Sequence, residues 1–190
     1  MAMRPGTLPS PNLQACQLVE PLWYAVYTRA QHEKRVLKAL GYKNVETFLP
    51  LYQTVRRWKD RRKQLLLPLF PGYVFVRIPL QIRLDVLTAP GVVRLVGING
   101  QPVPLADAEI ISIQRAVTLG CLSEPHTYLR IGKRIRVISG PLEGMEGVII
   151  RKKNRLRLVI SVDLIMRSIS FEVDEMDLRP IYEHHADGQN

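Results

Sequence analysis

"LPLFPGYVFVRI", at residues 67–78, is the stretch that decides the fold. Tyr73 and Phe75 alternate with Val74 and Val76, and successive residues of a strand face opposite sides of a sheet. The alternation therefore predicts a strand with a valine face toward the core and an aromatic face on the other side. Aromatic side chains offer large contact areas with few rotors to immobilise, which suits a face that docks on a partner. The alternative is that the chain's own helices or linker cover the aromatic side.

The segments around this strand predict an α+β unit with a mainly antiparallel sheet. The pattern predicts strands at residues 22–28, 46–55 and 92–98, and helices at 28–41, 84–89 and 107–118. Pro50 lies within the second strand, which favours an edge position or a bulge. Thr28 precedes Gln31 by three residues, which predicts a capping box at the start of the first helix.

Beyond residue 130 the pattern changes to short alternating strands, such as "RIRVI", "RLRLVISV" and "RSISFEV". Close spacing of such strands is typical of a small β-barrel. The preceding "LGCLSEPHTYLR" has no clear period and is interpreted as a linker. The expected organisation is a flexible leader at 1–21, an α+β domain at 22–118, a linker at 119–130, a barrel at 131–182 and a tail at 183–190.

The charge balance favours a polyanionic partner. The chain has 27 lysines and arginines against 17 acidic residues, a formal net charge of +10, and nucleic acid is the usual partner of so basic a protein. Its two cysteines lie far apart without a CxxC pattern, which favours a reducing compartment. No apolar run is long enough to predict a membrane span. No nucleophile motif, P-loop or metal-ligand spacing predicts an enzyme, a cofactor or a metal site.

Three stretches together resemble the NusG-type transcription elongation factors. They are "WYAVYTRAQHEKRV", "LFPGYVFV" and "GKRIRVISGPLEGMEGVII", the last similar to a KOW motif, and "PGVVRLVG" and "PLADAEI" fall between them in family order. The resemblance covers roughly residues 22–182. It implies an NGN-like α+β N-terminal domain followed by an all-β, SH3-like KOW barrel. Within the family, the first domain resembles the specialised RfaH, UpxY and LoaP types at least as closely as housekeeping NusG.

The resemblance implies that the N-terminal domain binds RNA polymerase at the clamp helices of its largest subunit. The residues that match this apolar depression or lie beside it are Trp23, Tyr27, Leu69, Phe70, Pro71, Tyr73 and Phe75. This assignment gives the aromatic face of the central strand a partner.

Two basic groups are candidates for binding nucleic acid. By resemblance to the RfaH-like members, Arg29, His32 and Arg35 at the first helix are expected to touch the exposed non-template DNA strand, although His32 differs in type. The second group is the run "RRWKDRRK", with Arg56, Arg57, Trp58, Lys59, Arg61, Arg62 and Lys63 at the tip of a hairpin or extended loop. Clustered cations bind phosphates without reading sequence, and a tryptophan can stack on an unpaired base. The alternative is a solvated loop with the tryptophan folded back on its own domain.

The resemblance implies that the C-terminal barrel recruits a small-ribosomal-subunit protein or Rho. The KOW motif and partner-binding candidates are Gly132, Gly140, Pro141, Leu142, Met145, Gly147, Ile165 and Met166. In RfaH the corresponding region also folds as a helical hairpin that masks the polymerase site. Here Gly140, Pro141 and Gly144 would interrupt helices, so a permanent barrel is expected.

These observations favour a non-enzymatic, monomeric, cytoplasmic transcription elongation factor that associates with the nucleoid through polymerase. Its expected action is antitermination, in which it suppresses pausing and termination. One alternative is a housekeeping NusG that couples polymerase to Rho or the ribosome. A second is a KOW-type RNA-binding or ribosome-associated protein, for which an aromatic docking face would have no use.

Overall fold

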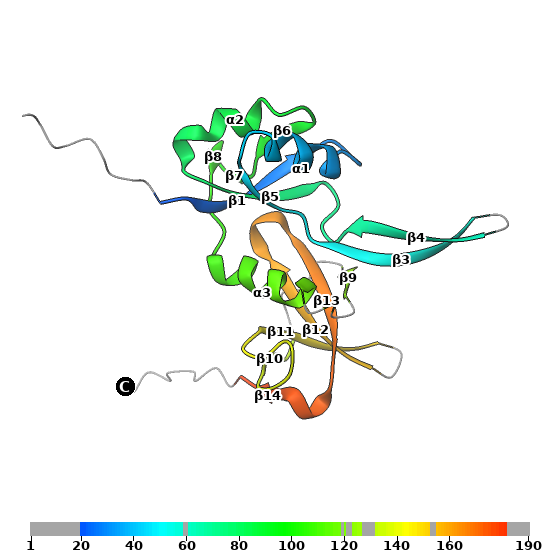
Figure 1. Ribbon diagram of the computed structural model, residues 1–190. Coiled ribbons are helices and arrows are strands. Elements are labelled where there is room, and N and C mark those ends of the chain that lie inside the picture. Colours follow the sequence, from blue (N-terminus) through cyan, green and yellow to red (C-terminus); the bar gives the residue numbers. More distant parts are fainter. Residues whose placement is uncertain are drawn as a thin grey trace, which may run out of the picture.

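Two larger antiparallel sheets organise the chain (Figure 1). The computed structural model describes residues 20–58, 61–118, 120, 123–126, 132–152 and 155–181. Within these residues the N-terminal sheet has the strand order β2-β5-β1-β6 and the C-terminal sheet has the order β14-β10-β11-β12-β13-β9. The described residues include no helix long and apolar enough to cross a membrane.

The N-terminal sheet is built around the strand that the sequence analysis started from. Its strands are β1 (Leu22–Thr28), β2 (Glu46–Phe48), β5 (Tyr73–Ile78) and β6 (Val92–Leu95). Strand β1 pairs with both β5 and β6 in antiparallel register, and β2 is an edge strand. A break at Pro50 separates β2 from the next strand, as expected for a proline in this position.

Helices cover both faces of this sheet. Helix α1 (Glu33–Gly41) and helix α2 (Arg83–Leu87), which follows the 3-10 turn η1 (Leu80–Ile82), pack on the face that carries Val74 and Val76. Helix α3 (Asp107–Thr118) lies against the opposite face, which carries Phe75. The predicted division into a valine face and an aromatic face is confirmed.

The predicted capping box at the first helix is wrong. Helix α1 begins at Glu33, its N-cap is His32, and no side chain caps it. Thr28 is instead the last residue of β1, and its buried hydroxyl has no hydrogen-bond partner among the described residues. A turn separates the strand from the helix, with Gln31 in the left-handed region at φ +61°. Thr28 therefore belongs to the strand and is not available to cap the helix.

A long hairpin projects from the base of the N-terminal sheet (Figure 1). Its strands β3 (Leu51–Trp58) and β4 (Arg61–Pro68) pair along their full length, from Leu51 opposite Pro68 to Trp58 opposite Arg61. The structure thus favours the hairpin over an irregular extended loop. A second, short hairpin joins β7 (Gly97–Ile98) to β8 (Gln101–Pro102).

The C-terminal region is rich in strands, as predicted. Its strands are β9 (Ser123–His126), β10 (Arg134–Val137), β11 (Glu146–Lys152), β12 (Arg155–Val162), β13 (Arg167–Val173) and β14 (Leu178–Pro180), with 3-10 turns η2 (Asp163–Ile165) and η3 (Glu175–Asp177). Among the described residues the ladders run from β14 at one edge to β9 at the other, and no ladder joins these two edges. Strand β9 lies within the segment interpreted as a linker, where it pairs with β13.

Candidate docking face and nucleic-acid interface

Gly72 forms the corner that precedes β5. Its φ of +85° lies in the left-handed region that favours glycine. Its N–H donates a hydrogen bond to Oε1 of Glu33 at 2.7 Å, and its carbonyl accepts one from the N–H of Thr28 at 2.9 Å. Glu33 is only 5% exposed, in the first turn of α1. Strand β1 and helix α1 therefore hold the corner together, and the sequence analysis missed the contribution of Glu33.

Aromatic contacts join the corner to the sheet. The rings of Phe70 and Phe75 meet edge to face with centroids 5.5 Å apart, and Phe48 stacks on Phe75 at 6.1 Å. Nearby, the centroids of Tyr27 and Tyr73 lie 5.4 Å apart. These are favourable geometries for aromatic pairs. The phenylalanines form one group of ring contacts, and the two tyrosines form a second pair.

The predicted docking residues divide into a buried group and an accessible rim. Trp23, Leu69, Phe70 and Phe75 are at most 4% exposed. The rim consists of Tyr27, which is 38% exposed, half-buried Tyr73 and exposed Pro71. Arg94 adds a cation to this rim, because its guanidinium carbon lies 5.6 Å from the centroid of Tyr27.

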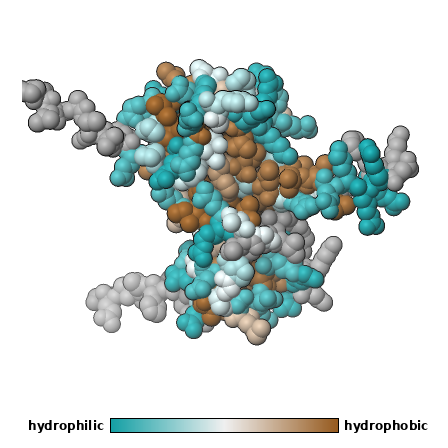
Figure 2. Space-filling view, viewed as in Figure 1, coloured by the Kyte–Doolittle hydropathy of each residue, from teal (hydrophilic) through white to brown (hydrophobic). Residues whose placement is uncertain are grey.

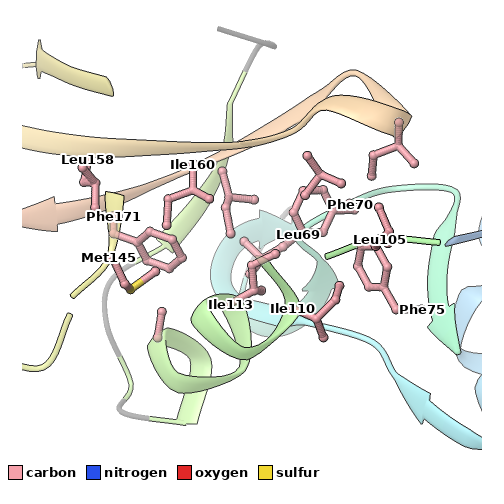
Figure 3. Packing of buried hydrophobic residues seen from close by; sticks show 14 of the residues in the cluster. Leu69, Phe70, Phe75, Leu105, Ile110, Ile113, Met145, Leu158, Ile160 and Phe171 are labelled. Atoms are coloured by element: carbon pink, nitrogen blue, oxygen red, sulfur yellow. The ribbon is translucent and has the colours of Figure 1, made fainter. Parts of the chain in front are cut away.

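The buried group is covered by the chain itself. Leu69, Phe70 and Phe75 belong to one apolar core that continues through α3 and into the C-terminal sheet. Figure 3 shows α3 between the side chains of the corner and those of the C-terminal sheet. We call this the closed arrangement: corner, α3 and C-terminal sheet share a single core. It corresponds to the alternative in which the chain's own elements cover the aromatic side.

Three of the C-terminal candidates are buried as well. Leu142, Met145 and Ile165 are at most 5% exposed and belong to the shared core. Met166 is 65% exposed and adopts a left-handed conformation at φ +49°. The remaining candidates, Gly132, Gly140, Pro141 and Gly147, occupy turns or strand positions, and Pro141, Gly132 and Gly140 are exposed.

The first basic group is only partly placed for nucleic acid. Arg29 and Arg35 are exposed at the start of α1. His32 is half-buried, and in the described part of the chain its buried Nδ1 has no hydrogen-bond partner. A Cβ at Gly91 would lie 2.9 Å from this nitrogen, so the imidazole packs closely against the backbone of Gly91. The structure therefore directs His32 inward and leaves the two arginines accessible.

The hairpin carries the second basic group. Arg57, Arg61, Arg62 and Lys63 are exposed, and the register places Arg57 opposite Arg62. Trp58 and Arg56 are strand residues at the same end, opposite Arg61 and Lys63, whereas Lys59 lies outside the described residues. Figure 2 shows apolar side chains at the base of the hairpin and hydrophilic ones toward its tip. The arrangement supports contact with phosphates at the tip.

A cavity of about 690 Å³ lies between part of α3 and the C-terminal sheet. Glu109 of α3 and Asp163 of η2 both line it, together with Arg134 and Glu146. Burial raises the pKa of Glu109, and the nearby carboxylate of Asp163 raises it further. Across the described part of the chain, no group of three His, Cys, Asp or Glu side chains is arranged to hold a metal ion.

Comparisons with known proteins agree with the order of the motifs. The family described as "Transcription termination factor nusG" matches residues 21–114. The chain is similar to the "Transcription termination/antitermination protein NusG" of Staphylococcus epidermidis, with 30% identity over 171 residues, covering 80% of this chain and 91% of the relative. The protein of the same name from Thermus thermophilus is 28% identical over 174 residues, which cover 80% of this chain and 94% of the relative.

A solved structure extends the similarity to both regions of the chain. It is described as "Domain interaction in Thermotoga maritima NusG" and has a TM-score of 0.53 at 27% identity, covering 86% of this chain and 98% of that protein. Sequence similarity and fold similarity to NusG proteins thus both extend over most of the chain. The chain belongs to the NusG family.

Proposed function

We propose that the chain is a non-enzymatic transcription factor that binds RNA polymerase through the corner and rim of its N-terminal domain. The observation that carries the proposal is the aromatic corner, where Phe70 meets Phe75 edge to face in the core and Tyr27 pairs with Tyr73 at the rim. The relatives named above as termination and antitermination proteins support the same class of function. The expected partner element is the pair of clamp helices of the largest polymerase subunit.

The basic surfaces support a second contact of the same factor. Arg29, just before α1, and Arg35 on α1 are proposed to meet the non-template strand in the elongation complex, and the hairpin cations are proposed to add contacts with phosphates. Such contacts would hold the strand beside the polymerase, and the proposed outcome is suppression of pausing and termination. Residues of the C-terminal region, including Met166 and Ile165, are proposed to recruit a ribosomal protein or Rho.

The closed arrangement sets a condition on this function. Leu69, Phe70 and Phe75 are at most 1% exposed in the closed arrangement and cannot contact a polymerase there. Ile165 is buried in the same core and is equally inaccessible. Binding is therefore proposed to require an open arrangement, in which the C-terminal sheet moves away from the corner without refolding.

The test uses the rim, because its residues are accessible without opening the core. Tyr27→Ala with Tyr73→Ala is expected to reduce capture of core polymerase by the full chain, since truncating a central aromatic anchor typically costs about 2 kcal/mol or more. Tyr42→Ala is the matched control, because Tyr42 is 76% exposed and lies at the other end of α1. Wild-type affinity in a folded double variant would contradict the docking assignment.

A further inference from the structure

We propose that Glu109 and Asp163 form a charge-sensitive latch, which sets the balance between the closed arrangement and an open one. This inference rests on the proposed function for its consequence, since opening is what would expose the docking face. The latch itself concerns only the contact between α3 and the C-terminal sheet, and it is measurable without any partner.

The two carboxylates border the same apolar contact from opposite sides. Glu109 directly precedes Ile110, which is fully buried in the shared core. Asp163 begins the turn η2, and Ile165 two residues later is buried in that core as well. Closure therefore brings both carboxylates to the wall of one cavity whenever the apolar residues beside them pack together.

Helix α3 is anchored to the N-terminal sheet, so opening would separate the two carboxylates. Leu105, just before the helix, forms an isolated antiparallel bridge with Trp23, and its N–H donates to the carbonyl of Trp23 at 2.8 Å. Asp163 belongs instead to the connection between β12 and β13 of the C-terminal sheet. A movement of the sheet away from the corner carries Asp163 with it and leaves Glu109 behind.

The other charged groups that line the cavity do not neutralise Glu109. Strand β10 contributes Arg134 and strand β11 contributes Glu146, and these two pair with each other at 3.7 Å. Strand β12 contributes no charged side chain to the lining, and from α3 itself only Glu109 is charged. Among the described residues, none donates a hydrogen bond or forms an ion pair with the Glu109 carboxylate. The charged group that acts on the Glu109 carboxylate is Asp163, which carries a like charge.

The direction of the pH dependence follows from this environment. In the closed arrangement burial, and then the carboxylate of Asp163, raise the pKa of Glu109 above its ordinary value. Opening hydrates Glu109 and removes it from Asp163, so its pKa falls back toward that value. Closure is therefore coupled to binding of a proton by Glu109. The closed arrangement is favoured at low pH and loses this stabilisation as the pH rises through the raised pKa.

Substitutions separate the charge of Glu109 from its size. Glu109→Gln keeps the shape and removes the repulsion, so the ratio of closed to open molecules is expected to rise roughly 2- to 5-fold, the range of a partly exposed ionic contact. Ser112→Asp places a further carboxylate on the cavity wall and is expected to lower the ratio. Asp107→Asn is the matched control, because Asp107 is an exposed acid of the same helix that does not line the cavity.

The measurement is the distance between two spin labels on the full chain. Tyr42→Cys on the N-terminal domain and Met176→Cys on the C-terminal region are 76% and 88% exposed positions, and serine replaces Cys16 and Cys121. Distance distributions recorded over a series of pH values are expected to show more of the short, closed distance at low pH, because the pKa of Glu109 is raised in the closed arrangement. The pH dependence should disappear in Glu109→Gln and persist in Asp107→Asn.

The outcomes distinguish the latch from the docking assignment. Distributions that stay the same across the pH range and in both cavity variants would overturn the latch, as would equal shifts in Asp107→Asn and Glu109→Gln. A shift toward the closed distance in Glu109→Gln, with polymerase capture unchanged, would support the latch and overturn the docking assignment. A shift toward the closed distance in Glu109→Gln, accompanied by weaker capture of polymerase, supports both the latch and the docking assignment.

Discussion

The corner at residues 69–75 and the hairpin tip at residues 56–63 are close in the sequence but differ in their exposure to solvent. Leu69, Phe70 and Phe75 at the corner are at most 1% exposed, whereas the described cations of the tip are exposed. Residue chemistry predicts which class of partner each segment can bind. Whether the segment is available depends on packing by α3 and the C-terminal sheet, which lie much later in the chain.

The largest expected effect comes from removing the centre of the corner. Phe75→Ala deletes a fully buried ring between Phe48 and Phe70, so the free energy of unfolding should fall by about 3–5 kcal/mol. Urea denaturation measures it. Leu66→Ala, at a 53% exposed position of the hairpin, is the control and should change stability by no more than about 0.5 kcal/mol. Equal losses in both variants would remove the distinction between corner and hairpin.

A smaller effect is expected from the support of the corner. Glu33→Leu leaves the N–H of Gly72 without its acceptor, and an unsatisfied buried donor costs about 1–3 kcal/mol. Glu33→Gln retains an acceptor oxygen and should recover most of the stability. Urea midpoints of the two variants, together with the amide chemical shift of Gly72, check the expectation. A glutamine variant as unstable as the leucine variant would show that the hydrogen bond does not hold the corner.

The sequence predicted the elements of the fold better than their ends. Alternation at residues 73–76 identified the two faces of the sheet correctly, because side-chain period is a local property. The start of α1 was misplaced because Thr28 carries a capping signature but its backbone is engaged by Gly72 in the neighbouring corner. Strand β9 was missed because its pairing with β13 is long-range, and "SEPH" itself has no strand pattern.

The prediction of the candidate site was also limited by contacts between residues that lie far apart in the sequence. The aromatic residues of the corner were found from their chemistry, but their burial depends on contacts with α3 and the C-terminal sheet, which no local pattern reveals. Glu33 carried one available signal, an acidic residue in the first turn of a helix. Its bond to Gly72, 39 residues away, was outside the reach of that signal. His32 was assigned to nucleic acid by position, and only the tertiary structure shows it packed on Gly91.

At the hairpin the expected effect is on binding rather than stability. Replacing Arg57, Arg61 and Arg62 with alanine should weaken binding to any exposed single strand and reduce the slope of log affinity against log salt by up to about 2, because each phosphate contact on a single strand contributes about 0.7. Fluorescence anisotropy at several salt concentrations measures the slope. Arg115→Ala, on an exposed position of α3, is the control. An unchanged slope would show that the hairpin cations do not contact phosphates and that the hairpin is simply solvated.

The smallest effect is expected at the start of α1. Arg29→Ala with Arg35→Ala should reduce the preference for a cognate pause element over a scrambled one by a few-fold, because two accessible arginines, one on α1 and one just before it, can contribute position as well as charge. Recruitment to elongation complexes paused on each sequence, at two salt concentrations, tests this. If these arginines and the hairpin arginines have equal effects on both sequences, α1 reads nothing and the factor acts independently of sequence.

The base of the hairpin has a mechanical consequence. Pro50 and Leu69 flank the hairpin and are joined by a hydrogen bond of 2.9 Å, and Lys34 of α1 braces β4 through the carbonyl of Leu66 at 2.7 Å. Eight paired positions at about 3.4 Å each make an arm roughly 25 Å long. On such an arm, a displacement of about 2 Å at the tip turns the base by only about 5°. A small displacement of the tip therefore leaves the corner, at the pivot, almost still.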